Sequence, residues 1–164
     1  MKIKDRILLG IVSGLAASMP GRVLNELEFK RGLTDQTYEQ AASSIFVKRK
    51  QIKTMPGKAI GIVANQALAA STGVLTAYVL SATGRDHAVL KGMGVGTLYW
   101  MALRGLPSKL GLALPQKKPL TPLLSLLDHL IFGATLGYLT GKLGHDRLFP
   151  DKTKNKTKGE AEGQ

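Results

Sequence analysis

The stretch from Ala59 to Gly84, AIGIVANQALAASTGVLTAYVLSATG, decides the fold of this chain. Its 26 residues lie between Lys58 and Arg85 and include no charged side chain. A helix needs about 20 apolar residues to cross the hydrocarbon core of a bilayer, which is about 30 Å thick. A surface helix of a soluble protein, by contrast, carries charged residues on its solvent-facing side. We therefore expect this stretch to be a transmembrane helix.

Three further stretches of low charge predict helices of the same kind. We expect four membrane spans, at about residues 5–24, 58–82, 87–106 and 121–143. The fourth begins with Thr121 and Pro122, which are typical of an N-cap and of the first turn of a helix. Lys91 lies one turn inside the third span, and its long side chain can reach the membrane surface. The predicted fold is an all-α, polytopic transmembrane bundle of four helices, formed by residues 1–150.

The N-terminal stretch allows two interpretations. Residues 1–18 combine a basic start, a short apolar run and the small residues Ala16, Ala17 and Ser18, which is the pattern of a cleaved signal peptide. Alternatively, the stretch is an uncleaved first span that continues past Pro20, because proline is tolerated in membrane helices. Cleavage would leave three spans and put the two ends of the chain on opposite sides of the membrane.

The long connection after the first span contains an amphipathic segment at about residues 35–52. Its apolar side chains recur with helical spacing at Tyr38, Ala41, Ala42, Ile45 and Phe46. Thr37 and Gln40 have the spacing of a capping box, which predicts the start of a helix. The segment is either an amphipathic helix lying in the membrane interface or a soluble helix packed on the end of the bundle.

The chain is strongly basic, with 23 Lys and Arg, 11 Asp and Glu and a formal net charge of +12. Many basic residues lie beside the apolar stretches, where they can meet anionic lipid headgroups. We therefore expect the lipid bilayer as partner. We expect no nucleic acid, because no aromatic side chains are interleaved with the basic ones. Residues 151–164 contain too little apolar surface to fold, so we expect a disordered basic tail there.

The distribution of positive charge sets the orientation only weakly. The side with both termini holds 11 Lys and Arg, and the opposite side holds 12. Short loops and termini weigh most in the positive-inside rule. We expect a multi-pass protein of the cell membrane with both termini in the cytoplasm.

Small residues recur at every fourth position within the four predicted spans. Such ridges let helix backbones approach closely in lipid, where apolar surface alone does not drive helices together. They bring helices together either within one chain or between copies of it, so a homo-oligomer is one possible outcome. The glycines that we expect to form packing contacts are Gly10, Gly14, Gly61, Gly73, Gly92, Gly96, Gly133, Gly137 and Gly141.

The polar residues inside the spans form a second pattern. If the spans alternate in direction, these residues come together near the membrane surface that faces the first and third loops. The predicted cluster consists of Arg22, Asn65, Gln66, Arg104, Asp128 and His129. Charged groups in a bilayer are costly and are usually paired. We expect Asp128 either to pair with Arg22 or Arg104 or to be protonated by desolvation.

The sequence gives no sign of catalysis or of a bound cofactor. The HExxH and GxSxG motifs are absent, and the chain has no cysteine. The three histidines are expected at different places, so we expect no metal site and no enzyme activity. The leading hypothesis is a structural or partner-binding membrane protein. One alternative is a small transporter or proton-coupled carrier that uses Asp128 and His129, and another is a protein that binds lipid headgroups.

Two motifs in the third and fourth predicted spans suggest a family. The stretch LKGMGVGTLYW from Leu90 to Trp100, a link rich in Pro and Gly, and LDHLIFG from Leu127 to Gly133 resemble the YagU-like small bacterial inner-membrane proteins. In these proteins a glycine-rich helix with an aromatic residue precedes a helix with a central histidine near a glycine. The resemblance implies a bacterial inner-membrane protein without an established biochemical activity, and it identifies His129 as a residue to test.

Overall fold

The computed structural model describes residues 2–111, 114 and 117–150 of the chain. These residues form five α-helices and two short 3-10 helices, and the described part contains no strand. The α-helices are α1 (Arg6–Lys30), α2 (Tyr38–Ser43), α3 (Met55–Thr83), α4 (Ala88–Lys109) and α5 (Thr121–Leu143). The 3-10 helices are η1 (Arg49–Gln51) and η2 (Asp146–Leu148). The tail predicted at 151–164 lies outside the described residues.

Long helices lie at all four of the stretches predicted to be spans. Three of them, α1, α3 and α5, are long and apolar enough to cross a membrane. α4 is similar in length at 22 residues, but with Lys91, Arg104 and Lys109 it contains no stretch that is apolar enough to cross a membrane. The crossing of the membrane by α4 therefore stays a prediction. The predicted continuation of the first helix past Pro20 is confirmed, because α1 runs through this proline to Lys30.

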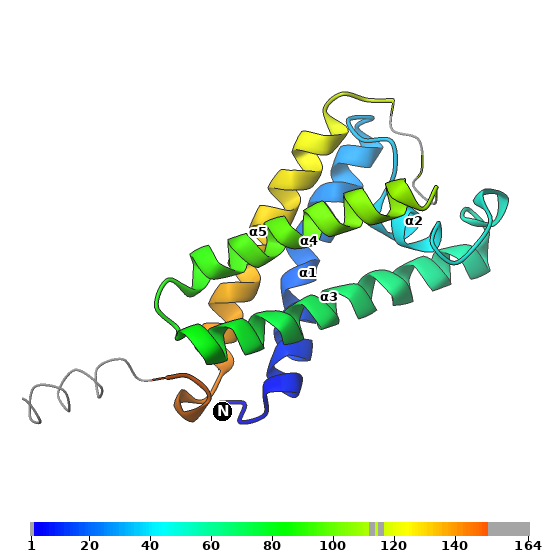
Figure 1. Ribbon diagram of the computed structural model, residues 1–164. Coiled ribbons are helices and arrows are strands. Elements are labelled where there is room, and N and C mark those ends of the chain that lie inside the picture. Colours follow the sequence, from blue (N-terminus) through cyan, green and yellow to red (C-terminus); the bar gives the residue numbers. More distant parts are fainter. Residues whose placement is uncertain (1, 112–113, 115–116, 151–164) are drawn as a thin grey trace, which may run out of the picture.

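The four long helices pack as two pairs that meet in the middle of the molecule. α1 packs against α3, α4 packs against α5, and the contact between α1 and α5 joins the pairs. α3 and α4 are connected by the short turn at residues 84–87, in which Gly84 and His87 have φ angles of 88° and 52°. From this turn they diverge, and α2 lies at their open end (Figure 1). α3 and α4 are thus closest at their turn and separate toward the end that carries α2 (Figure 1).

Glycines lie where the paired helices cross, as the spacing predicts. A Cβ atom on Gly10 would overlap the backbone of Val74, and one on Gly73 would overlap the carbonyl group of Gly10. In the other pair, Gly92 and Gly133 each lie against the carbonyl oxygen of the other. Close backbone contacts of the same kind occur at Gly14, Gly61, Gly96 and Gly137. At these positions any side chain larger than hydrogen would push the backbones apart.

The glycine at the end of the α5 ridge behaves differently from the others. A Cβ atom on Gly141 would make only an ordinary contact, at 3.4 Å from the Cβ of Ala88. Gly141 therefore packs against α4 as predicted, but without a close approach of the two backbones. The remaining ridge contacts all join helices of the same chain, so these glycines give no argument for a homo-oligomer.

The predicted amphipathic segment forms a shorter helix than expected. α2 has only six residues, and η1 follows it after an irregular connection. The capping box is confirmed, since the side chains of Thr37 and Gln40 both form their expected bonds. α2 packs on α3, and the hydroxyl of Ser43 donates a hydrogen bond of 2.8 Å to the carbonyl of Gly57. This packing agrees with a helix docked on the end of the bundle.

The first and third loops are tied together beside α2. The Asp35 carboxylate accepts hydrogen bonds of 2.9 and 3.0 Å from the backbone N–H groups of Lys117 and Lys118. It also accepts a bond of 3.2 Å from the hydroxyl of Thr121. The predicted N-cap role of Thr121 is wrong, because Thr121 is already the first residue of α5 and Leu120 precedes it without a side-chain bond. The clamp at Asp35 thus fixes the start of α5 against the end of α1.

Candidate ligand-binding cavity

A cavity of about 580 Å³ occupies one half of the helix bundle, and all five α-helices contribute to its wall. The lining residues farthest from the end that carries α2 are Ser18, Ala69, Tyr99 and Phe132, and they define its deep part. Each lies at or beside the middle of its helix, and every other lining residue on the four long helices lies nearer the end that carries α2. The cavity therefore extends from the middle of the bundle to the loops, along half the length of the helices.

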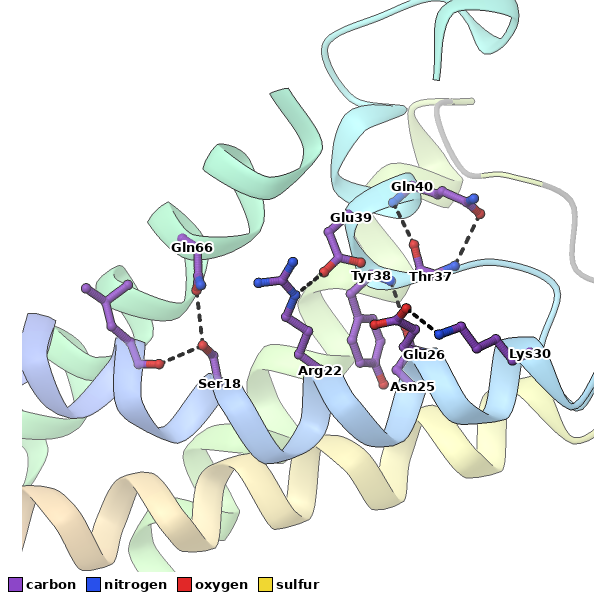
Figure 2. A network of polar contacts seen from close by, with 11 residues as sticks. Ser18, Arg22, Asn25, Glu26, Lys30, Thr37, Tyr38, Glu39, Gln40 and Gln66 are labelled. Carbon is purple, nitrogen blue, oxygen red and sulfur yellow. Dashed lines mark hydrogen bonds and ion pairs between the residues drawn. The ribbon is translucent and has the colours of Figure 1, made fainter. Parts of the chain in front are cut away.

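Most of the predicted polar cluster lies in this cavity. The residues of the cluster that line it are Arg22, Asn65, Arg104, Asp128 and His129. Gln66 does not line the cavity, but its side-chain oxygen accepts a hydrogen bond of 3.0 Å from Ser18, which does (Figure 2). The alternating direction of the helices thus brings together residues that are far apart in the sequence.

The expected pairing of Asp128 with an arginine is wrong. The partner of Asp128 is Tyr38 on α2, whose hydroxyl donates a hydrogen bond of 2.7 Å to Oδ2. Arg22 instead forms an ion pair with Glu39, with 2.7 Å between Nε and Oε1 (Figure 2). Both partners come from α2, a segment whose path could not be deduced from the alternation of the spans.

Tyr38 is held in place by several contacts. Its backbone N–H, at the start of α2, donates a hydrogen bond of 2.8 Å to the side chain of Asn25, which is buried on α1 (Figure 2). Its ring packs edge-on against the His129 ring, with centroids 5.4 Å apart. Burial, followed by the charge of Asp128, raises the pKa of Tyr38 above its ordinary value. The hydroxyl therefore keeps its proton and remains a hydrogen-bond donor.

His129 is a packed side chain whose orientation is fixed by the backbone. Its Nδ1 lies 2.7 Å from the carbonyl oxygen of Ser125, one turn earlier in α5. A carbonyl only accepts hydrogen bonds, so the proton must be on Nδ1. Tyr99 covers the ring at a centroid distance of 5.5 Å. Among the described residues no group of three His, Cys, Asp or Glu side chains could hold a metal ion.

Arg104 and Trp100 lie together on the cavity wall without polar partners. The guanidinium of Arg104 lies over the Trp100 ring, with Cζ 5.5 Å from its centroid. Arg104 Nη1 and Trp100 Nε1 are both buried, and neither has a hydrogen-bond partner among the described residues. Unpaired buried donors are rare in folded proteins and call for an explanation.

Sequence reasoning missed three residues of this site, namely Asn25, Tyr38 and Glu39. Tyr38 was assigned to the apolar side of the amphipathic segment, and no polar role was expected for it. A tyrosine hydroxyl usually has a partner when it is buried, and that rule was the signal available in the sequence. Asn25 and Glu39 lie outside the predicted spans, so placing the polar residues by depth could not find them.

No family model, no curated protein and no solved structure matches this chain. The resemblance to the YagU-like proteins therefore stays a prediction. The function must therefore be inferred from the geometry of the site. The wall of the cavity has an apolar part and a polar part. The deep part is formed by Ala69, Tyr99 and Phe132, whereas the part near the loops carries arginine, asparagine and aspartate side chains. Such a cavity suits a molecule with an apolar end and a polar end.

Proposed function

We propose that this chain is an integral membrane protein that binds a small amphipathic molecule in the cavity beside α2. In this proposal α4 crosses the bilayer together with α1, α3 and α5, so that four helices span it. Large apolar side chains exposed on the outer faces of all four helices support this placement. They include Val12, Val63, Leu98 and Ile131. In water such surfaces would be an aggregation liability, whereas lipid would cover them favourably.

The extent of the cavity carries the functional proposal. In a four-span arrangement the middle of each helix lies near the centre of the bilayer. A cavity that extends from mid-helix to the loops would then span one leaflet, with its apolar part at the depth of the acyl chains. Its arginines would lie near the headgroups, where α2 also lies in this proposal. This arrangement matches the layout of a lipid-like molecule standing in one leaflet.

Two other hypotheses from the sequence receive less support. Helix packing alone accounts for the glycine contacts, but it leaves the polar cavity without a role. A carrier that uses Asp128 and His129 needs access from both sides of the membrane. In the described residues the half near the termini is packed at Gly10, Gly73 and Gly133. We therefore propose binding, in a multi-pass cell-membrane protein whose termini face the cytoplasm.

Trp100 provides a direct test, because it is the only tryptophan in the chain and it lines the cavity. The full chain is purified in dodecyl maltoside, and the detergent is exchanged for its brominated analogue, which quenches nearby indole fluorescence. Binding in the cavity predicts strong quenching of Trp100. Ala41→Phe should weaken this quenching, because Ala41 lines the cavity and a larger side chain would occupy it.

The matched control is Ala67→Phe, which adds the same side chain at an exposed position of α3 outside the cavity. This variant should be quenched as strongly as the parent protein. Equal quenching of both variants would mean that bromine reaches Trp100 from the outer surface, and the proposed function would then be wrong.

A further inference from the structure

We infer that Arg104 and Trp100 form a binding site for the phosphate group of a membrane phospholipid. This inference rests on the proposed function, since it identifies the class of amphipathic molecule that the cavity takes. The cavity would hold the headgroup phosphate near Arg104 and part of the acyl chains against the deep apolar wall.

The first argument is the missing counter-charge of Arg104. An arginine guanidinium stays protonated in proteins, and burying part of it without a partner is unfavourable. Arg104 forms no ion pair with any described residue, and its Nη1 is buried without a hydrogen bond. The acidic side chain in the described cavity wall is Asp128, and Tyr38 already donates to it. A ligand anion would supply the acceptor that the chain does not.

The second argument is that, in the described part of the chain, Trp100 Nε1 is an unpaired hydrogen-bond donor beside Arg104 Nη1. Trp100 Nε1 is buried and has no hydrogen-bond partner among the described residues. The guanidinium of Arg104 lies over the Trp100 ring in a cation–π contact. The two residues are four positions apart on α4, so their side chains lie on the same side of the helix. A phosphate group has several oxygen atoms that accept hydrogen bonds, so it can bind Arg104 and Trp100 at once. Arginine commonly binds phosphate through two hydrogen bonds.

The third argument is the overall charge of the cavity wall. Its described charged residues are Arg22, Arg49, Arg104 and Asp128, which is an excess of positive charge. Glu39 neutralises Arg22 from outside the wall, and Asp128 accepts a hydrogen bond from the Tyr38 hydroxyl. The wall thus carries more basic than acidic side chains, and Arg104 is the arginine in it whose buried Nη1 has no hydrogen-bond partner among the described residues.

The apolar wall distinguishes a lipid from a free phosphate compound. A phosphate ion bound at Arg104 would leave Ala69, Tyr99 and Phe132 facing an unfilled space in a cavity of about 580 Å³. Acyl chains would bury this apolar surface, which contributes about 25 cal/mol for each Å² removed from water. The apolar wall therefore favours a phospholipid over a soluble phosphate compound as the ligand of Arg104.

The test compares three probes on the purified full chain in dodecyl maltoside. Brominated phosphatidylglycerol carries both the phosphate and the chains, brominated diacylglycerol carries the chains alone, and soluble glycerol phosphate carries the phosphate alone. Quenching of Trp100 reports binding of the two brominated lipids, and glycerol phosphate is added as a competitor. We expect phosphatidylglycerol to bind about tenfold more tightly than diacylglycerol, as a charge-assisted hydrogen bond predicts.

Arg104→Gln should reduce phosphatidylglycerol affinity to that of diacylglycerol, and Arg104→Lys should give an intermediate value because it keeps the charge but loses the planar fork. Lys109→Gln is the matched control, since Lys109 is an exposed basic residue on the same helix outside the cavity wall. It should leave the affinities unchanged. Circular dichroism and thermal unfolding without added lipid show whether each variant folds.

The outcomes separate the inference from the function on which it rests. If Arg104→Gln folds and keeps the preference for phosphatidylglycerol, the phosphate site is wrong although amphiphile binding stands. If glycerol phosphate displaces phosphatidylglycerol at equal concentration, the ligand is a soluble phosphate ester and the lipid assignment is wrong. If neither brominated lipid gives quenching that Ala41→Phe weakens, both the inference and the proposed function fail.

Discussion

The hydroxyl of Tyr38 donates a hydrogen bond of 2.7 Å to the carboxylate of Asp128, although 90 positions separate the two residues. Tyr38 belongs to the six-residue α2, which is too short to be stable by itself. Asp128 belongs to α5 and is buried. The bond therefore does two things at once, because it satisfies a buried carboxyl group and fixes α2 over the cavity.

Tyr38→Phe removes the donor and leaves the buried Asp128 without its partner. We expect a loss of about 1–3 kcal/mol in the free energy of unfolding, which is the usual penalty for a buried polar group left unpaired. Thermal unfolding in dodecyl maltoside measures it. Tyr78→Phe is the control, because Tyr78 is an exposed tyrosine of α3. A double-mutant cycle with Asp128→Asn should give a coupling energy, and strict additivity of the two changes would contradict the bond.

Gly92 and Gly94 offer a sharp comparison within α4. A Cβ atom on Gly92 would overlap the carbonyl of Gly133, whereas one on Gly94 would have no neighbour within 4 Å. Gly92→Ala should therefore destabilise the fold by about 1–3 kcal/mol through overpacking. Gly94→Ala should leave stability unchanged or raise it by up to about 1 kcal/mol, because alanine favours a helix. Unfolding of the two variants in detergent should differ in this direction, and equal stability would count against the crossing.

The positions of the long helices could be predicted from the sequence, because each lies at an apolar stretch of low charge that is bounded by charged residues. The uncharged run of Ala59–Gly84 lies within the helix Met55–Thr83 and its following turn. The helix crossings could be predicted as well, since only small residues allow backbones to touch, as at Gly92 and Gly133. The end of α1 was missed, because Lys30 lies in a polar stretch that hydropathy alone assigns to the loop.

The polar cluster was predicted in outline, but its bonds were not. The alternation of the spans brings Arg22 and Asp128 to the same end of the bundle, and a charge argument then favours pairing them. The observed partners depend on the path of the long first loop. The Asp35 clamp and the bond from Tyr38 to Asn25 determine this path. Such contacts between loops leave no periodic signal in the sequence.

The other end of the molecule contains a pH-sensitive contact. Asp146 in η2 accepts bonds from Lys2 at 2.8 Å and Arg85 at 2.7 Å, and these two bonds hold its pKa below the ordinary value. A lowered pKa in the folded state means stability that is present above the ordinary pKa and is lost as pH falls through the folded one. We therefore expect stability to fall below about pH 4, the ordinary value of an aspartate.

Asp146→Asn isolates this contribution. The difference in melting temperature between the parent protein and the variant should be largest near neutral pH and should shrink as the solution becomes more acidic. Asp35, whose pKa is also lowered, chiefly by the backbone N–H of Lys118, is present in both proteins and cancels in the difference. High salt should reduce the effect, because these side chains are exposed. A difference that does not change between pH 3 and pH 7 would contradict the prediction.

The membrane arrangement is tested by fractionation of the full chain with a reporter fused after Gln164. If four helices cross the bilayer, the protein resists carbonate extraction and is released by detergent. An even number of spans puts both ends on one side, and the positive-inside rule favours the cytoplasm. A cytoplasmic reporter is therefore the expected result. Release by carbonate would mean that α1, α3 and α5 are apolar enough to cross a membrane but do not do so.

An external reporter on a carbonate-resistant protein would have a different meaning. It would indicate that one helix fails to cross or that the whole bundle is inverted. α4 is the first candidate, since it is the one long helix of the described chain without a stretch apolar enough to cross a membrane, and it carries Lys91 and Arg104. A second reporter inserted in the turn after α3, at Gly84, tests the last two helices. Reporters on the same side at both sites mean that α4 and α5 both cross, so that an inverted bundle or a failure of α1 or α3 explains the external position. Reporters on opposite sides mean that one of the last two helices does not cross.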